Sequence, residues 1–398
     1  MVAGRGETIG ADLAAVTMGI DRFERSRSSG ESLLDGEGLV PIFMGDDIVE
    51  ARSYSAWDEV FADIDELAVQ VEDVGVDQRG IFLRDMVPSL RAAAQLFSGA
   101  ELSYAEKVRD LVGAEPAPVP DEEIAAHATA LSDGLARAGF SRGTLRNRVE
   151  SWEAARAIAP ERIEAEFRAL MALARARTAA MIFDPGDYDM ALNPLRDVPF
   201  TARCGFAERR MDLNVDNAFT RAGLKHLVCH EVFPGHATQL LSTRAEVDAG
   251  RSEPDALLCT TNAVTGCVQE GIGDQGVQLI DWIEDLDDEI HLALRSLKSA
   301  AQTTAAWRLM AEGQPRDEVA DYLRTVACGQ EAWVQGRLRM ASHPFRGPFI
   351  ASYYAGNESV RRVRERVSPE QRGEFIATLY GEVHSPQSLE MFGAEAAA

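Results

Sequence analysis

The spacing of hydrophobic positions along most of the chain predicts α-helices. Apolar residues recur at intervals of three and four in the stretch 56–74, as they do on one face of a helix. The same period continues through 79–97, where Pro88 predicts a kink, and through 143–181, where it breaks near Pro160. The chain has neither an internal repeat nor a regular alternation of strands with helices. We therefore expect a mainly α fold with few short strands. The apolar positions of the first stripe are Trp57, Val60, Phe61, Ile64, Leu67 and Val71.

Two stretches interrupt the helical pattern. Residues 113–123 are rich in proline and are the best linker candidate, and the acidic residues at 121–123 suit the start of a helix over 121–138. Proline, glycine and aspartate accumulate over 183–216, which predicts loops and short strands. We expect an N-terminal helical region at 1–112 and a second region at 123–398 that carries the candidate site residues, the two integrated into one globular unit, 1–398.

Composition narrows the class of partner. The 398-residue chain has 40 Lys plus Arg against 64 Asp plus Glu, a net charge of −24, which disfavours nucleic acid and anionic membranes as partners. Its five cysteines are an odd number without a Cys-x-x-Cys pair, as expected for reduced thiols. No signal-peptide pattern and no apolar run of membrane-spanning length is evident. We expect a cytoplasmic protein with neither nucleic-acid nor membrane partners.

The stretch HEVFPGH, residues 230–236, resembles a zinc motif with an insertion. The familiar His-Glu-x-x-His motif places two histidines four residues apart on one helical face. His230 and His236 are six residues apart, so an unbroken helix would point them about 120° away from each other. Pro234 clashes with the carbonyl group of His230 and supplies no N–H, while Gly235 accepts almost any backbone conformation. We predict a break in the helix here that lets both histidines face one metal ion.

A third ligand candidate lies in the segment EGIGD, residues 270–274. Glu270 could bind the metal, and Asp274, one turn later, could orient a histidine ligand through its free ring N–H. Gly271 and Gly273 would let two helices approach closely, which would compensate for the cost of glycine in a helix. His226, one turn before His230, is either a further supporting group or a core histidine.

Three segments together resemble the family known as domain of unknown function 885. They are HEVFPGHATQ at 230–239, EGIGD at 270–274 and SHPFRGPFIASYYAG at 342–356, and the stretch 104–120 also looks familial. The family carries a His-Glu-x-x-Pro-Gly-His-His run, a Glu-Gly motif and a later Tyr-x-x-Gly element. The resemblance implies a helical, gluzincin-like metallohydrolase fold with a central active-site cleft and one Zn²⁺ per chain. One departure is clear, because the second consecutive histidine is replaced by Ala237.

The resemblance also implies roles for individual residues. His230, His236 and Glu270 would be the zinc ligands, and Glu231 the general base. Three protein ligands leave a fourth position for water. Tyr353 is the first choice as donor to the oxyanion, although tyrosines also commonly line a core edge. The residue types also suggest candidates for contacts with the substrate, which are Arg209, Arg210, His343, Arg346 and Tyr354. For Arg209 and Arg210 the alternative is a structural ion pair, which is the more common role of such arginines.

These features predict a zinc-dependent hydrolase that cleaves a peptide or other amide bond in a short peptide or small molecule. Two alternatives stay open. The same scaffold could catalyse a non-peptidase biosynthetic reaction on a small amino-acid-like substrate, which Ala237 favours. The chain could also be a metal-free pseudoenzyme that keeps the fold as a binding module.

Overall fold

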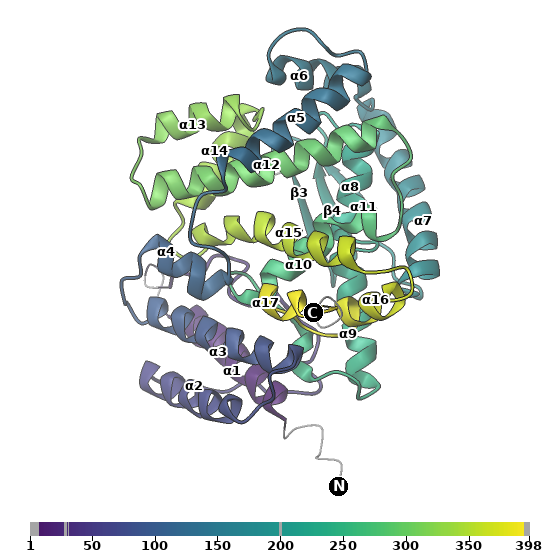
Figure 1. The fold of residues 1–398 in the computed structure, drawn as a ribbon. Helices are drawn as coiled ribbons and strands as arrows, with labels where there is room; N and C mark the ends of the chain where they lie inside the picture. Colours follow the sequence, from purple (N-terminus) through teal and green to yellow (C-terminus); the bar gives the residue numbers. More distant parts are fainter. Residues whose placement is uncertain (1–7, 28–29, 31, 199–200, 394–398) are drawn as a thin grey trace.

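Helices dominate the computed structural model, which describes residues 8–27, 30, 32–198 and 201–393 (Figure 1). The predicted mainly α class is therefore confirmed. None of the helices in these ranges combines the length and the apolar character that crossing a bilayer requires. The longer helices are α1 (Ile9–Ser26), α2 (Trp57–Glu72), α3 (Gln78–Phe97), α5 (Asp121–Arg137), α6 (Leu145–Arg156), α7 (Ile163–Met181), α8 (Arg221–Glu231), α9 (His236–Asp248), α10 (Val264–Asp274), α12 (Leu286–Met310), α13 (Arg316–Thr325), α14 (Glu331–Ala341), α15 (Ile350–Arg366) and α16 (Arg372–Gly381). The shorter helical segments are α4 (Tyr104–Glu106), η1 (Lys107–Val112), η2 (Pro160–Arg162), η3 (Pro254–Leu257), α11 (Gly276–Leu279), η4 (Gly347–Phe349) and α17 (Pro386–Glu390).

The helices follow the hydrophobic pattern closely. Helix α2 buries Val60, Ile64, Leu67 and Val71, which are four positions of the predicted stripe. Helix α5 begins after the proline-rich linker, as expected, and the long pattern over 143–181 is divided into α6 and α7 near its proline. Helix α3 continues on both sides of Pro88. The predicted elements are thus largely those that form.

Short strands form where helical periodicity fails. Strand β2 (Ala191–Leu195) pairs in parallel with β4 (Arg210–Asn214), and β3 (Ala202–Gly205) pairs antiparallel with the other side of β4. A second, two-stranded sheet joins β1 (Ile42–Phe43) to β5 (Leu258–Cys259). This second pairing connects the N-terminal region to the segment just before α10.

The N-terminal region shares a hydrophobic core with the rest of the chain. Leu13 of α1 and Phe97 of α3 belong to the same buried cluster as Cys267 of α10 and Ile350 of α15. In Figure 1 the helices α1, α2 and α3 lie together below α10 and α15. A separate cluster packs α7 and α8 against β4. Helix α10 packs against α8 and α15, and α12 packs against the same two helices. These helices carry His230, Glu270 and Tyr353.

Candidate metal centre

The helix that carries the first histidine ends where the sequence predicts. Helix α8 ends at Glu231, and α9 begins at His236. The peptide bond between Phe233 and Pro234 is cis. Gly235 lies so close to α8 that a Cβ atom on it would be 1.7 Å from the carbonyl oxygen of His230. Only glycine fits at this position, and the predicted helix break is confirmed.

The break brings the two histidines and one glutamate to a common point. The Nε2 atoms of His230 and His236 lie 3.2 Å apart. The Glu270 carboxylate of α10 is 3.4 Å from His230 Nε2 and 4.0 Å from His236 Nε2. Ligands about 2.1 Å from a tetrahedral ion stand about 3.4 Å from one another. The three side chains therefore have nearly the spacing that one metal ion requires.

The chemistry of these three groups also fits a cation. Two ring nitrogens and a carboxylate approach one another, and Glu270 Oε2 is buried without a hydrogen-bond partner in the described chain. Burial opposes a charge on His230, but Asp274 and Glu270 outweigh it and raise the pKa of His230 well above its usual range. The local field thus favours positive charge, and two histidines with one carboxylate form a ligand set that suits Zn²⁺.

The centre is partly exposed to solvent. The side chain of His236 is 24% exposed, against 12% for His230 and 14% for Glu270. A fourth ligand such as water could reach a metal ion held by these three side chains from the side of His236, the most exposed of them. An open fourth position distinguishes catalytic from structural zinc sites.

The buried Asp274 carboxylate contacts His230 at Nδ1, the ring nitrogen that is not directed at Glu270. Asp274 Oδ1 lies 3.2 Å from His230 Nδ1, 3.4 Å from His226 Nε2 and 2.9 Å from Arg295 Nη2 of α12. Burial alone would raise the pKa of Asp274, but the Arg295 guanidinium and the two histidines hold it well below its usual range. A permanent carboxylate at His230 Nδ1 favours the tautomer whose Nε2 lone pair is available to a metal.

His226, His230 and Asp274 form a second group of possible ligands. Two observations disfavour a metal ion there. Arg295 already occupies Asp274 Oδ1, and its fixed positive charge would repel a cation. Burial lowers the pKa of His226 to about 4, so this histidine is a neutral partner of Asp274. The geometry therefore favours the group that contains His236 and Glu270.

Glycines set the distances around the centre. A Cβ atom on Gly273 would lie 2.7 Å from His230 Nδ1, so the imidazole ring occupies the space of a missing side chain. Gly271 faces the opposite way and contacts Gly356 of α15. The two glycines of the EGIGD segment thus bring α10 close to two different helices, α8 and α15.

The position of the missing second histidine does not face the centre. Ala237 is 1% exposed and belongs to the hydrophobic cluster that also contains Phe233. One residue earlier, His236 reaches His230 and Glu270. A histidine at 237 would project into an apolar core, about 100° around the helix from His236.

The candidate general base lies at the end of α8, next to a strand. Glu231 is hydrogen-bonded to Cys204 of β3, and its charge acts on both His230 and His236. Burial, together with the charge of Glu231, raises the pKa of Cys204 well above its usual range. Cys204 is therefore a neutral thiol beside the carboxylate. The sequence pattern gives no sign of this pair, because only the packing of β3 against α8 relates the two residues.

Tyr353 lies close enough to Glu270 for the charge of that carboxylate to act on it. Its ring is 5.5 Å from the guanidinium carbon of Arg337, and the two side chains are also hydrogen-bonded. Burial and the charge of Glu270 raise the pKa of Tyr353 to about 12, against a smaller opposing effect of Arg337. The phenol group therefore keeps its proton and can act as a donor. Arg337, like Arg295, was not among the predicted residues.

Two of the predicted substrate contacts are engaged elsewhere. The hydroxyl group of Tyr354 is hydrogen-bonded to Glu123 of α5. Arg346 forms ion pairs with Asp35 at 3.0 Å and with Glu37 at 2.8 Å. Neither Tyr354 nor Arg346 has a described contact with the histidines or the carboxylate of the centre.

The remaining predicted contacts also have local partners. The ring Nδ1 of His343 accepts hydrogen bonds from the backbone N–H groups two and three residues later. Arg209 lies over the ring of Tyr188 at 5.1 Å, and Arg210 pairs with Asp212 at 2.9 Å. The structure does not bring these three residues into described contact with the centre.

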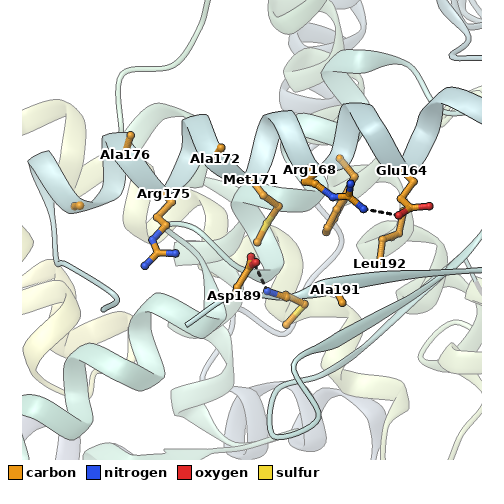
Figure 2. A pocket seen from close by; sticks show the side chains of 12 residues that line it. Glu164, Arg168, Met171, Ala172, Arg175, Ala176, Asp189, Ala191 and Leu192 are labelled. Carbon is orange, nitrogen blue, oxygen red and sulfur yellow. Dashed lines mark hydrogen bonds and ion pairs between the residues drawn. The ribbon is translucent and has the colours of Figure 1, made fainter. Parts of the chain in front are cut away.

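A separate groove lies between α7 and β2 (Figure 2). Its volume is about 580 Å³, and its wall includes Phe167, Met171 and Leu192. Arg168 and Glu164 form an ion pair at its rim. None of the predicted site residues lines this groove, so it is distinct from the metal centre.

Comparisons with known proteins show a shared fold only. No family model matches the chain, and no curated protein matches it. A solved structure described as the putative lipoprotein from Colwellia psychrerythraea is similar with a TM-score of 0.58 and 13% identity over 86% of this chain. A putative lipoprotein of unknown function from Shewanella oneidensis has a TM-score of 0.53 and 14% identity, over 84% of this chain and 71% of that chain. The chain spans 63% of the length of the Colwellia protein.

Proposed function

We propose that the protein is a zinc-dependent hydrolase that cleaves a peptide or other amide bond. The observation that carries the proposal is the approach of His230, His236 and Glu270 to one point, with the Glu231 carboxylate adjacent. These residues form the ligand set and the base that the sequence resemblance implies. The substrate would be a short peptide or a small molecule.

Each residue of the centre would have a separate role in amide cleavage. A divalent cation held by His230, His236 and Glu270 would supply a Lewis acid that polarises a carbonyl group and lowers the pKa of a water molecule. The Glu231 carboxylate would take the proton of the attacking water and pass it to the leaving nitrogen. Cys204 would keep the carboxylate oriented by its hydrogen bond. The Tyr353 hydroxyl would donate to the carbonyl oxygen as negative charge develops there.

Metal content and turnover together test the proposal. We expect about one zinc ion per chain by elemental mass spectrometry, lost in His236→Ala and retained in the control His127→Ala, whose histidine lies on α5. Glu231→Gln should retain the metal and lose about 10²- to 10⁴-fold in turnover on a panel of peptides and acylated amino acids. The control Glu115→Gln changes an exposed glutamate and should leave both properties unchanged.

Three outcomes would contradict parts of the proposal. The absence of metal after zinc addition would leave a binding module without this chemistry. Full activity of metal-loaded Glu231→Gln would exclude Glu231 as the base. Bound zinc without turnover on any amide would favour the non-peptidase reaction on the same scaffold.

The proposal includes a cytoplasmic location. The two structural neighbours are described as lipoproteins, so membrane association is the alternative to test. Recovery of the native protein with the membrane fraction after cell fractionation would contradict the proposed location.

A further inference from the structure

Helix α12 carries a row of basic side chains past the metal centre. His291, Arg295 and Lys298 recur at intervals of four and three, which places them on one face of the helix. The ring of His291 is 5.3 Å from that of His226, and Arg295 binds Asp274 at 2.9 Å. This face is therefore directed at the residues behind the centre, and Lys298 lies one turn beyond Arg295.

A tryptophan on α14 joins Lys298 to a second cation. Lys298 Nζ lies 5.6 Å from the ring centroid of Trp333, and the guanidinium carbon of Arg337 lies 5.7 Å from it. Arg337 also contacts the ring of Tyr353. Helix α12 packs against both α14 and α15, which carry Arg337 and Tyr353 (Figure 1). Arg337 thus contacts both Trp333, which Lys298 also contacts, and Tyr353, the proposed hydrogen-bond donor to the oxyanion.

The two cations differ from the neighbouring basic residues in their partners. Arg295 and Arg346 each form an ion pair with a carboxylate. Within the described residues, Lys298 and Arg337 form no such pair, and the hydrogen bonds of Arg337 go to Met340 Sδ, at 3.8 Å, and to the Tyr353 side chain. Both side chains are half-buried, in a chain with a net charge of −24. Burying a cation without a carboxylate partner costs free energy, although this acidic protein has many carboxylates, and a bound anion would remove that cost.

The electrostatics of Lys298 agree with this view. Burial lowers the pKa of Lys298, and the positive charges of Arg295 and Arg337 lower it further, against the opposing effects of Glu153 and Cys328. A bound anion would offset the burial and the mutual repulsion of the cations.

We propose that Lys298 and Arg337 bind a carboxylate group of the substrate next to the metal centre. This inference rests on the proposed function and specifies its substrate class: an amide with a free carboxylate a short distance from the cleaved bond. The C-terminus of a short peptide and the carboxylate of an N-acylated amino acid both meet this description. The planar guanidinium of Arg337 matches a carboxylate in a bidentate pair, and Lys298 adds a point charge. Tyr353, between Arg337 and Glu270, would separate the carboxylate subsite from the reacting carbonyl.

A binding experiment tests the subsite without requiring turnover. Calorimetric titration of the zinc-loaded Glu231→Gln protein compares N-acetyl-alanyl-alanine with its C-terminal amide. We expect the acid to bind at least about tenfold more tightly than the amide. Arg337→Gln and Lys298→Met should each remove most of this preference and leave the affinity for the amide unchanged. Arg339→Gln, an exposed position on the same helix, is the control and should change neither affinity.

The variants need a check on folding and on the type of anion. If Arg337→Gln proves unstable, Arg337→Lys takes its place. Arg337→Lys keeps the charge without the planar guanidinium and should retain part of the preference for the acid. Equal affinities for acid and amide, no binding of the acid, or a preference that survives in both variants would overturn the proposal. If inorganic phosphate competes more strongly than acetate, the subsite prefers a phosphate group and the carboxylate assignment is wrong.

Turnover separates a failure of this inference from a failure of the proposed function. In the enzyme with Glu231 intact, Lys298→Met, which leaves the contact between Arg337 and Tyr353 in place, should raise KM for the acid about tenfold with little change in kcat. If acid and amide are hydrolysed at equal rates and the variants change neither rate, the proposed hydrolase is supported and the carboxylate subsite is contradicted. Preferential binding of the acid without hydrolysis of either compound would keep the subsite and remove the hydrolase.

Discussion

Gly271 of α10 and Gly356 of α15 bring two helix backbones into direct contact. A Cβ atom on Gly271 would lie 2.2 Å from the Gly356 carbonyl oxygen, and one on Gly356 would lie 1.8 Å from the carbonyl oxygen of Cys267. Helix α10 carries Glu270, and α15 carries Tyr353. The absence of two side chains therefore sets the distance between a proposed metal ligand and the proposed oxyanion donor.

Gly271→Ala should destabilise the protein because neither backbone can yield without moving a whole helix. We expect the free energy of unfolding in urea to fall by about 2–3 kcal/mol. Gly373→Ala on α16 is the matched control, since a Cβ there meets nothing within 4 Å. The control should raise stability by about 0.5–1 kcal/mol. Equal effects of the two substitutions would show that the helix contact is not tight.

Asp274→Asn should weaken metal binding without removing a ligand. The substitution takes away the charge that fixes His230 through Nδ1, and such supporting groups are typically worth about 10- to 100-fold in metal affinity. Competition with a zinc chelator measures the change. Asp187→Asn is the control, because that side chain is 96% exposed. An unchanged affinity in Asp274→Asn would indicate that the carboxylate serves only the fold.

Exchange of residues 236 and 237 tests which position provides the ligand. The double variant His236→Ala/Ala237→His should bind no zinc, because the new histidine projects into the core around Phe233. Ala237→His alone should keep the metal and lose about 1–3 kcal/mol of stability from overpacking. Elemental mass spectrometry and urea unfolding provide the two measurements. Zinc in the double variant at near-normal affinity would assign the ligand to position 237.

His384 should make stability depend on pH. Burial lowers its pKa to about 4, and its Nε2 atom lies 3.0 Å from the Thr378 carbonyl oxygen. The folded state holds this histidine neutral, whereas the unfolded state protonates it near pH 6.5. His384 therefore does not oppose folding above about pH 6.5. As the pH falls from about 6.5 to about 4, protonation in the unfolded state lowers the free energy of unfolding by on the order of 3 kcal/mol.

A variant isolates this contribution. His384→Gln keeps an N–H donor and removes the titration, so its urea midpoint should change less than that of the wild type between pH 7 and pH 4. His226, whose pKa is also lowered to about 4, is present in both proteins and cancels in the comparison. Parallel pH profiles would contradict the assignment.

The central part of the candidate site could be predicted from the sequence because its chemistry is local. The Pro-Gly pair between His230 and His236 requires a helix break, and the break occurs between those residues. Glu270 and Asp274 are one turn apart on α10, so one helix presents both carboxylates to His230. Short-range geometry was sufficient for the helix break and for most helices, whereas the approach of α10 to His230 was expected from the ligand pattern and the family resemblance.

The surroundings of the site depend on tertiary packing, and sequence spacing does not show it. Cys204 contacts Glu231 only because β3 packs beside α8. Arg346, expected to contact the substrate, instead meets Asp35 and Glu37, which lie more than 300 positions earlier in the chain. His291 had no partner in the sequence pattern, but α12 packs against α8 and brings it to His226.

The proposed metal ligands and the two unpaired cations lie on separate stretches of the chain. The ligands belong to α8, α9 and α10, whereas Lys298 and Arg337 belong to α12 and α14. Natural selection, or a protein engineer, could therefore replace Lys298 and Arg337 and retune the proposed substrate choice, while the metal ligands are kept together with Arg295, which shares α12 with Lys298 and binds Asp274. Relatives with this ligand set would then differ first at positions 298 and 337, and a comparison of those two positions would sort them by substrate.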